Sequence, residues 1–191
     1  MQGEHVTTET VLVVCSANQC RSPLAAALLR RALDDANVLV IDAGTGASGY
    51  PVTEETLTTA ARLGVDLSDH LSTRLDPALV DAADLVLTME RAHVRTIVVD
   101  DPEAWSKTFT LKELVRRADE VGVRAAGEPL AEWLTALHEG RTRGDLLGAS
   151  PVDDVADPTS DRRVDHASLA EELDELVGAM VGYVWPDPSG R

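Results

Sequence analysis

The sequence predicts an α/β fold in which helices cover a parallel sheet, within a single domain over residues 1–191. Short apolar runs alternate with longer helix-forming stretches, as strands and crossover helices do in such folds. The first run, residues 11–15, is continuously apolar and rich in β-branched side chains, which is typical of a strand covered on both faces. The length of 191 residues suits one domain, and no linker-like stretch divides it.

Four runs are predicted as strands: residues 11–15, 38–41, 84–88 and 108–110. Apolar and β-branched side chains dominate the first three, and the fourth is a short Thr-Phe-Thr sequence. The second strand is followed by a Gly-Thr-Gly sequence at residues 44–46, where glycine allows the chain to turn.

Helices are predicted in the other segments: residues 23–33, 54–63, 91–99, 111–121, 129–139 and 165–184. Thr53 is a favourable N-cap, followed by two glutamates in the first turn, and Gly64 suits the position after the helix end. The last two helices each carry an apolar stripe along one side. Residues 141–150 are predicted as a loop, and residues 1–9 and 186–191 as frayed ends.

The chain is strongly acidic, with 17 basic and 33 acidic side chains and a formal net charge of −16. Proteins that bind nucleic acids or anionic membranes through their general surface need basic patches, so this balance argues against both kinds of partner. Aromatic residues make up only 3% of the chain, which argues against a stacking surface for single strands. No apolar run approaches the roughly 20 residues of a membrane-spanning helix.

Two cysteines and five scattered histidines limit the redox and metal chemistry of the chain. Cys15 and Cys20 are too few for a disulfide scaffold or an all-cysteine zinc site, and the histidines lack metal-ligand spacing. The acidic N-terminal segment does not have the pattern of a secretory signal. We therefore expect a cytoplasmic protein without a metal or cofactor, and the excess of arginine over lysine suggests a bacterial origin.

The strongest chemical signal is the sequence Cys-Ser-Ala-Asn-Gln-Cys-Arg-Ser-Pro at residues 15–23, between a predicted strand and a predicted helix. A loop in this position directs backbone N–H groups toward an anion at the helix N-terminus, where the helix dipole adds positive potential. The guanidinium of Arg21 can hold two phosphate oxygens. The residues predicted to bind phosphate are Ser16, Ala17, Asn18, Gln19, Cys20, Arg21 and Ser22.

The same surroundings favour the thiolate form of Cys15, because a helix N-terminus and an arginine both stabilise a negative sulfur. Ser22 can donate a hydrogen bond to that sulfur and stabilise it as a leaving group. A nucleophilic sulfur inside an anion-binding loop is suited to attack on a phosphate monoester. A Cys-x5-Arg sequence also arises by chance around a buried core cysteine, but its place between a strand and a helix favours the catalytic interpretation.

The segment resembles the signature Cys-x-x-Asn-x-Cys-Arg-Ser-Pro of the low-molecular-weight protein tyrosine phosphatase family. The resemblance continues through residues 42–46, 67–74 and 84–89 and ends at residues 154–158, so it covers nearly the whole chain. It implies a three-layer fold with a four-stranded parallel sheet, helices on both faces and the phosphate loop after the first strand. It also implies metal-independent hydrolysis of phosphate esters through a phosphocysteine intermediate.

The resemblance further implies that Asp157, which precedes a proline, gives a proton to the leaving group and later takes one from water. Asp153 and Asp154 are the alternatives, because they lie in the same predicted loop, but only Asp157 is followed by proline. In this scheme Cys15 attacks phosphorus while loop amides and Arg21 hold the phosphate oxygens.

The network that supports the loop in this family is only partly present. Asn18 is predicted to take a left-handed conformation, which Asn tolerates better than most residues. In the family it is tied to a serine and a histidine. His70 matches the histidine, with an ordinary surface histidine as the alternative, whereas Ala43 stands where the serine usually lies.

The residues that would wall the substrate pocket depart from the family pattern. The family surrounds phosphotyrosine with aromatic side chains, whereas only Tyr50 follows the Gly-Thr-Gly sequence, and Thr159 follows the Asp-Pro pair. Phosphotyrosine on a protein is the leading substrate, and a sugar phosphate or other small monoester is the alternative. Two other functions stay open: an arsenate reductase, which needs cysteines beyond Cys20 that this chain lacks, and a non-catalytic phosphate-binding protein.

Cys20 and residues 123–147 carry two further predictions. Oxidation can join Cys20 to Cys15 in a reversible disulfide, the alternative being a packing role for Cys20. Residues 123–147 exceed the family norm and contain the amphipathic helix with Trp133, predicted as an extra layer on the core or, alternatively, as a lid near Asp157.

Overall fold

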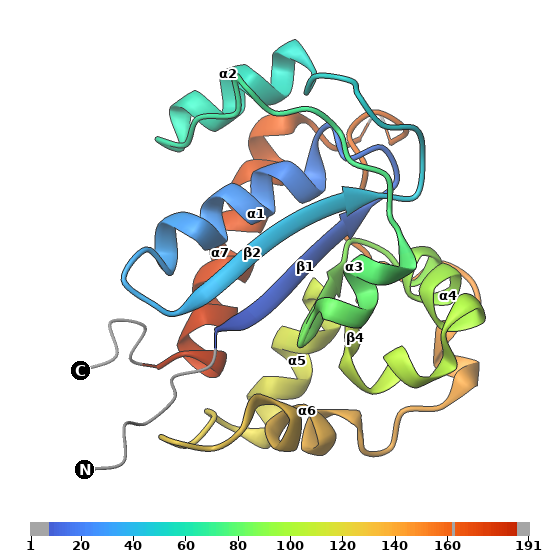
Figure 1. Cartoon of the computed structure of the whole chain (residues 1–191). Helices are drawn as coiled ribbons and strands as arrows, with labels where there is room; N and C mark the ends of the chain where they lie inside the picture. The colour runs from blue at the N-terminus through green and yellow to red at the C-terminus, as the bar shows by residue number, and fades with distance from the viewer. Residues whose placement is uncertain (1–7, 162, 187–191) are drawn as a thin grey trace.

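The computed structural model describes residues 8–161 and 163–186. Its sheet has four parallel strands in the order β2-β1-β3-β4, which confirms the predicted fold class (Figure 1). The strands are β1 (Glu9–Cys15), β2 (Val38–Gly44), β3 (Leu85–Thr88) and β4 (Thr108–Thr110). All four lie where the sequence predicted them, with β2 extended to the glycine that opens the Gly-Thr-Gly turn.

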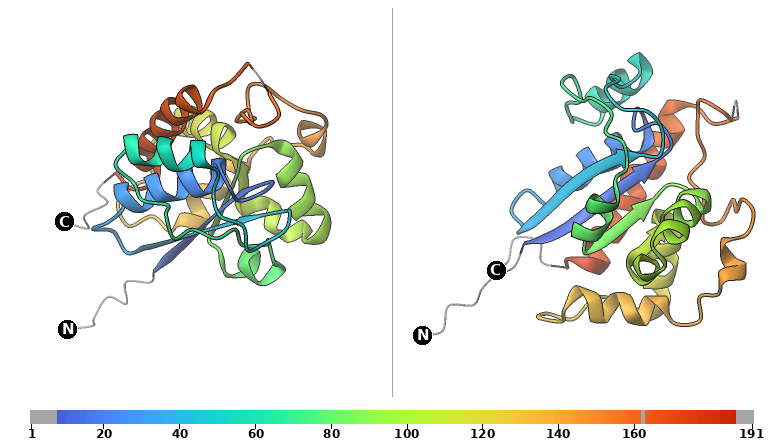
Figure 2. Two further views of the ribbon diagram at one scale, coloured as in Figure 1. Left: turned by 90° about the horizontal axis from the view of Figure 1, so that it is seen from above. Right: turned by 45° about the vertical axis from the view of Figure 1, so that its right-hand side comes forward.

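Helices cover both faces of the sheet, as Figures 1 and 2 show. They are α1 (Arg21–Ala32), α2 (Glu54–Arg62), α3 (Pro77–Ala82), α4 (Arg91–Asp100), α5 (Leu111–Val121), α6 (Leu130–His138), α7 (His166–Val184) and the 3-10 turns η1 (Pro102–Lys107) and η2 (Arg143–Leu146). In the described part of the chain, no helix combines the length and apolar character needed to cross a bilayer.

The two faces of β1 explain why its residues 11–15 are continuously apolar. Val11 and Val13 pack in the core formed with α1, α5 and α7, whereas Leu12 and Val14 pack against α3 and α4. All four side chains are fully buried. Because successive side chains of a strand point to opposite faces, a strand between two helical layers must be apolar at every position.

Short helical elements escaped the sequence prediction. α3 and η1 have six residues each, too few for an apolar periodicity to show. Each nevertheless begins with an aspartate cap and a proline, with Asp76 accepting from Ala78 N and Asp101 from Glu103 N. Inside the predicted loop at 141–150, η2 forms a 3-10 turn that corrects that prediction.

The prediction of a frayed end at residues 1–9 is wrong at Glu9, which opens β1 and pairs with Val38. The Glu9 carboxylate also accepts hydrogen bonds at 2.6 Å from Arg124 Nη2 and from Trp185 Nε1. Of the other residues predicted as frayed, Thr8 and Pro186 belong to no helix or strand, although Thr8 Oγ1 donates to Asn37 Oδ1 at 3.0 Å, and residues 1–7 and 187–191 lie outside the described residues.

The segment at residues 123–147 places α6 against α5 and η1. Trp133, Leu134 and Leu137 are buried, and Trp133 Nε1 donates to Gly122 O at 3.2 Å. Figure 1 shows α6 at the lower end of the molecule, opposite the carboxyl ends of the strands. α6 thus packs on the core, away from the loop that follows β1 in this structure, and the role of the segment stays a prediction.

Candidate active site

The loop between β1 and α1 lies at the carboxyl end of the sheet, where ligands bind in open parallel sheets. The N–H groups of Thr45 and Gly46 donate to Cys15 O at 3.0 Å and Ser16 O at 2.8 Å. α1 begins at Arg21, directly after the loop. Neighbouring backbone thus fixes the loop in front of a helix N-terminus, as the sequence predicted.

Cys15 is 2% exposed, and its sulfur accepts two hydrogen bonds. The donors are Asn18 N at 3.2 Å and Ser22 Oγ at 3.0 Å. Both stabilise negative charge on sulfur, which is what a thiolate nucleophile and leaving group needs. Ser22 therefore lies within hydrogen-bond distance of the sulfur, and its role in catalysis stays a prediction.

Arg21 is 2% exposed and contacts oxygen atoms through both of its terminal nitrogens. Nη2 donates to Asp157 Oδ2 at 2.8 Å, and Nη1 donates to Val155 O at 3.0 Å and to Glu90. Ser16 Oγ accepts from Nη2 at 3.4 Å. A buried guanidinium needs such partners because an unpaired buried charge is costly.

A cavity of about 240 Å³ opens over the loop. Its lining joins the sulfur, the guanidinium and the carboxylate to small or polar side chains: Cys15, Ala17, Gln19, Cys20, Arg21, Thr53, Asp157 and Thr159. None of these residues is aromatic. One tetrahedral anion in this cavity can meet a thiol, a guanidinium and a carboxylate at the same time.

Asn18 has a φ of 53°, the left-handed conformation that the sequence predicted. Its Nδ2 donates to Ser22 Oγ at 3.0 Å and to Asp42 Oδ1 at 2.7 Å, and its Oδ1 accepts from Thr73 N at 2.7 Å. His70 Nε2 donates to Asn18 O at 2.9 Å. Ala43 has no hydroxyl to bind Asn18, and the neighbouring Asp42 supplies a hydrogen-bond acceptor instead. Sequence reasoning missed this role of Asp42.

Of the three aspartates considered as proton donor, Asp153, Asp154 and Asp157, only Asp157 lines the cavity. Asp153 is 2% exposed and bonds to Arg91 and Arg116. Asp154 accepts from the backbone N–H groups of Arg91 and Ser150. The geometry therefore favours Asp157 and gives the other two structural contacts.

Glu90 and His93 also contact the loop, although no local pattern in the sequence pointed to either residue. Glu90 pairs with Arg21, and His93 Nε2 lies 2.9 Å from Ser16 Oγ. His93 is 4% exposed, and burial lowers its pKa to about 4, so the ring is neutral at pH 7. It supports Ser16 as an uncharged hydrogen-bond partner.

Cys20 lines the same cavity as Cys15, and both thiols are free. Burial raises the pKa of Cys20 to about 11, so its thiol is protonated at neutral pH. The two cysteines thus differ in surroundings, and the role of Cys20 as a redox partner stays a prediction.

The two residues predicted as pocket walls lie in different places. Thr159 lines the cavity, and its N–H and hydroxyl donate to Asp157 Oδ1 at 3.0 and 2.7 Å. Tyr50 is not among the lining residues, and its side chain is 54% exposed. Thr159 therefore holds the Asp157 carboxylate as well as bounding the cavity.

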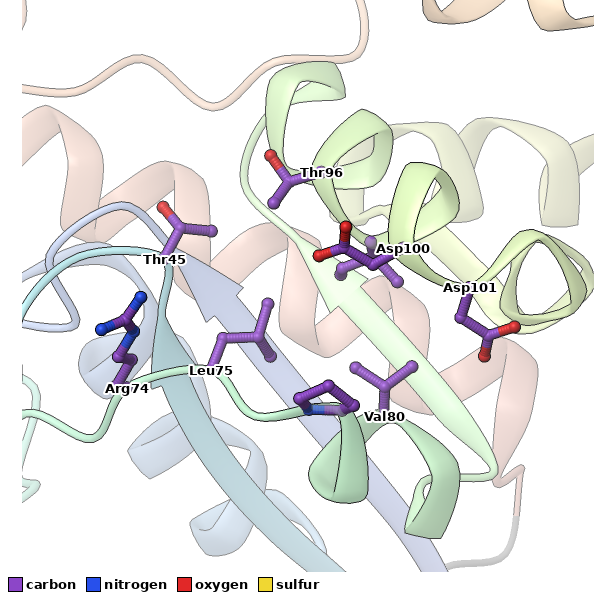
Figure 3. Close-up of a pocket in the computed structure, with 9 residues that line it drawn as sticks. Thr45, Arg74, Leu75, Val80, Thr96, Asp100 and Asp101 are labelled. Carbon is purple, nitrogen blue, oxygen red and sulfur yellow. The ribbon is translucent and has the colours of Figure 1, made fainter.

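A second cavity, of about 170 Å³, lies between the end of β2, α3 and α4 (Figure 3). Arg74 and Thr45 stand on one side of it and Thr96 and Asp100 on the other. It shares no lining residue with the first cavity and contains no thiol or imidazole, so it is separate from the candidate site. Across residues 8–161 and 163–186, no three His, Cys, Asp or Glu side chains gather into a metal site.

Comparison with known proteins agrees with this geometry. Residues 10–129 match the family described as low molecular weight phosphotyrosine protein phosphatase. The probable low molecular weight protein-tyrosine-phosphatase EpsP of Ralstonia nicotianae is 43% identical over 132 residues, which are 69% of this chain and 85% of the relative.

Some relatives carry a different specificity. A protein-arginine-phosphatase of Geobacillus stearothermophilus is 36% identical over 138 residues, 72% of this chain and 92% of the relative. The solved structure of the YwlE arginine phosphatase from that organism aligns with a TM-score of 0.65 at 28% identity, covering 90% of each chain. From the family match, these relatives and the shared fold, the chain belongs to the low molecular weight phosphotyrosine protein phosphatase family.

Proposed function

We propose that this chain hydrolyses phosphate esters on proteins, phosphotyrosine above all, through a phosphocysteine formed on Cys15. The observation that carries the proposal is the meeting of Cys15, Arg21 and Asp157 at one cavity of about 240 Å³. The chemistry requires a reduced thiol, and a reducing compartment would keep both cysteines free, which supports a cytoplasmic location.

The first step forms the phosphocysteine. Loop amides and Arg21 hold the phosphate oxygens, and the Cys15 thiolate attacks phosphorus on the side opposite the leaving group. As the sulfur–phosphorus bond forms, the bond to the leaving oxygen breaks, and protonated Asp157 gives that oxygen its proton. Thr159 Oγ1 donates to Asp157 Oδ1 at 2.7 Å, which leaves Oδ2 as the oxygen that transfers the proton.

The second step restores the enzyme. The Asp157 carboxylate takes a proton from water, and the resulting hydroxide oxygen attacks phosphorus while the bond to sulfur breaks. Inorganic phosphate forms and Cys15 leaves as a thiolate. The hydrogen bonds from Ser22 Oγ and Asn18 N stabilise the departing sulfur.

A second candidate substrate is phosphoarginine on proteins. The cavity has no aromatic lining residue to stack on a phenyl ring, and Gln19, Thr53 and Thr159 make its wall polar. Gln19 Nε2 donates to Pro51 O at 2.7 Å, which leaves its amide oxygen to accept a hydrogen bond. A guanidinium leaving group has the N–H donors that such a wall suits.

A hydrolysis panel tests the function and its specificity. Phosphotyrosine peptides, phosphoarginine peptides, a sugar phosphate and p-nitrophenyl phosphate are compared by kcat/KM on the wild type and Cys15→Ser. Preference for either peptide assigns the protein substrate, and preference for the sugar phosphate assigns the small-monoester alternative. Absence of turnover with every substrate would overturn the enzymatic proposal and favour a phosphate-binding protein.

Asp157→Asn is expected to slow hydrolysis in proportion to the need of the leaving group for a proton. Phenyl phosphate should lose about 10²–10³-fold in kcat/KM, which reports the steps up to phosphocysteine formation, whereas 2,4-dinitrophenyl phosphate should lose less than about tenfold. The slope of log kcat/KM against leaving-group pKa measures the effect. An equal loss on both esters would show that another residue donates the proton.

Gly44→Ala is expected to displace the phosphate loop. A Cβ at Gly44 would lie 2.8 Å from Asn18 N and from Ser16 O, which is closer than real Cβ contacts. The strain should lower stability by about 1–3 kcal/mol, and the misplaced loop should reduce kcat/KM by more than about tenfold.

Thermal unfolding and steady-state kinetics measure these two losses. Gly182→Ala is the matched control, because its Cβ would meet no atom within 4 Å. Wild-type activity in Gly44→Ala would contradict the close packing described here.

A further inference from the structure

Asp153 lies four residues before Asp157 and contacts neither the cavity nor Cys15. We propose that Asp153, held by Arg91 and Arg116, is a positioning residue that fixes the loop carrying Asp157. This inference rests on the proposed function, because it concerns the proton donor of that same reaction.

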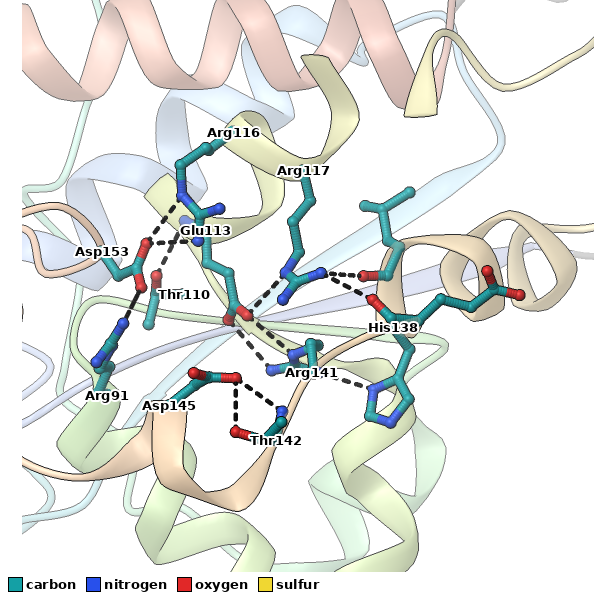
Figure 4. A network of polar contacts seen from close by, with 12 residues as sticks. Arg91, Thr110, Glu113, Arg116, Arg117, His138, Arg141, Thr142, Asp145 and Asp153 are labelled. Carbon is teal, nitrogen blue, oxygen red and sulfur yellow. Dashed lines mark hydrogen bonds and ion pairs between the residues drawn. The ribbon is translucent and has the colours of Figure 1, made fainter. Parts of the chain in front are cut away.

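Two arginines grip the Asp153 carboxylate, one on each oxygen (Figure 4). Oδ2 accepts from Arg91 Nη2 at 2.5 Å and Nε at 3.1 Å, and Oδ1 accepts from Arg116 Nη2 at 3.1 Å and Nε at 3.3 Å. The Asp153 side chain is only 3% exposed. Because Arg91 belongs to α4 and Arg116 to α5, the grip ties the loop to helices on opposite faces of the sheet.

The helix that carries Arg116, α5, is itself held by further polar contacts. Glu113 of α5 binds Arg117 one turn later and also accepts from Arg141 at 2.9 and 3.1 Å (Figure 4). The Arg141 guanidinium stacks 4.1 Å from the Phe109 ring and donates to Thr108 O at 2.8 Å. α5, and with it Arg116, is thereby anchored to β4.

From Asp153 the chain reaches the reacting groups within four residues. Val155 N donates to Met89 O at 2.7 Å, and Val155 O accepts from Arg21 Nη1 at 3.0 Å. Two residues later, Asp157 Oδ2 accepts from Nη2 of the same guanidinium. Asp157 and Val155 therefore share one partner, and the position of Asp153 sets the register in which both meet Arg21.

Asp157 needs this support because the described residues of the segment 147–165, those other than 162, contain no helix or strand. Proton transfer requires hydrogen-bond reach, and a shift of about 1 Å can cost on the order of 10²-fold in rate. A buried ion triad is expensive to desolvate and contributes little net stability by itself. Its value here is therefore geometric: it presents Asp157 to the leaving group.

The test compares kcat/KM of Asp153→Asn and of the wild type on aryl phosphates of different leaving-group pKa, because kcat/KM reports the steps up to phosphocysteine formation. Phenyl phosphate should react about tenfold slower or more, a part of the 10²–10⁴-fold that a general acid contributes, while 2,4-dinitrophenyl phosphate should change less than about threefold. The double variant Asp153→Asn/Asp157→Asn should be no more than about twofold slower than Asp157→Asn alone, because Asp153 acts through Asp157.

Asp161→Asn is the matched control, since it removes another aspartate–arginine pair from the same loop, one whose Arg163 side chain is 89% exposed. It should retain the wild-type slope. The inference would be overturned by equal losses of rate on the two esters, or by additive losses in the double variant. Either result would show that Asp153 has only a structural role.

Arg116→Gln provides a second route if Asp153→Asn does not fold, because the Arg116 side chain is 42% exposed and its loss leaves Arg91 in place. It should shift the leaving-group slope in the same direction, by less, and an unchanged slope would overturn the inference. Failure of the wild type on every aryl phosphate is a different result: it removes the proposed function itself.

Discussion

Cys15→Ser is expected to reduce turnover of p-nitrophenyl phosphate by about 10⁶-fold, the scale seen when a nucleophile is removed from an enzyme. A serine hydroxyl stays protonated at neutral pH, whereas the sulfur accepts hydrogen bonds from Asn18 N and Ser22 Oγ that stabilise its anion. No group lining the described cavity is free to deprotonate a serine in the first step, because its one carboxylate, Asp157, must then carry the proton that the leaving group needs.

The variant should keep its fold and its anion site. Serine is smaller than cysteine, and its oxygen can accept from the same two donors, so inorganic phosphate should still bind. Calorimetry with phosphate and a thermal melt check these points. Residual turnover within about 10²-fold of the wild type would place the nucleophile elsewhere.

Arg21→Lys is expected to reduce kcat by about 10³-fold, although it conserves the charge. The guanidinium donates to Val155 O and to Asp157 through two different nitrogens. The single nitrogen of a lysine ammonium cannot make both hydrogen bonds with the same geometry. The same planar fork is what grips two oxygens of a phosphate, and the charge on those oxygens must be stabilised through the transition state.

Arg31→Lys is the matched control for this change. It lies in the same helix, but its side chain is 46% exposed and pairs with Asp174 at 2.9 Å on the surface. It should leave kcat unchanged, since exposed ion pairs contribute little. An Arg21→Lys variant with wild-type kcat would show that charge alone suffices at this position.

The sequence predicted the fold well because its elements are locally encoded. β1 is apolar from Val11 to Cys15, and the predicted bounds of α5 and β4 agree with the structure. α3 and η1 were missed because six residues carry capping signals but no periodicity. The fold class follows from the long elements, so these omissions did not affect it.

The site residues that are contiguous in the sequence could be predicted, whereas those that come from distant segments could not. The loop at residues 15–22 is one stretch of sequence, and Asp157 carries a proline beside it. Glu90 lies 69 residues from Arg21, and His93 lies 77 residues from Ser16. Their roles arise only when β3 is placed beside β1, and no local pattern in a single sequence encodes that contact.

The ion pair between Arg21 and Asp157 also bears on how the enzyme releases its product. When inorganic phosphate leaves the loop, its contact with Arg21 is lost, and the carboxylates of Asp157 and Glu90 pair with the guanidinium instead. The buried guanidinium therefore has an anionic partner throughout the cycle. These carboxylates compete with every anion for Arg21, which weakens the hold on product and shortens its residence. Free phosphate should therefore be a poor inhibitor, and the site becomes available again soon after each cycle.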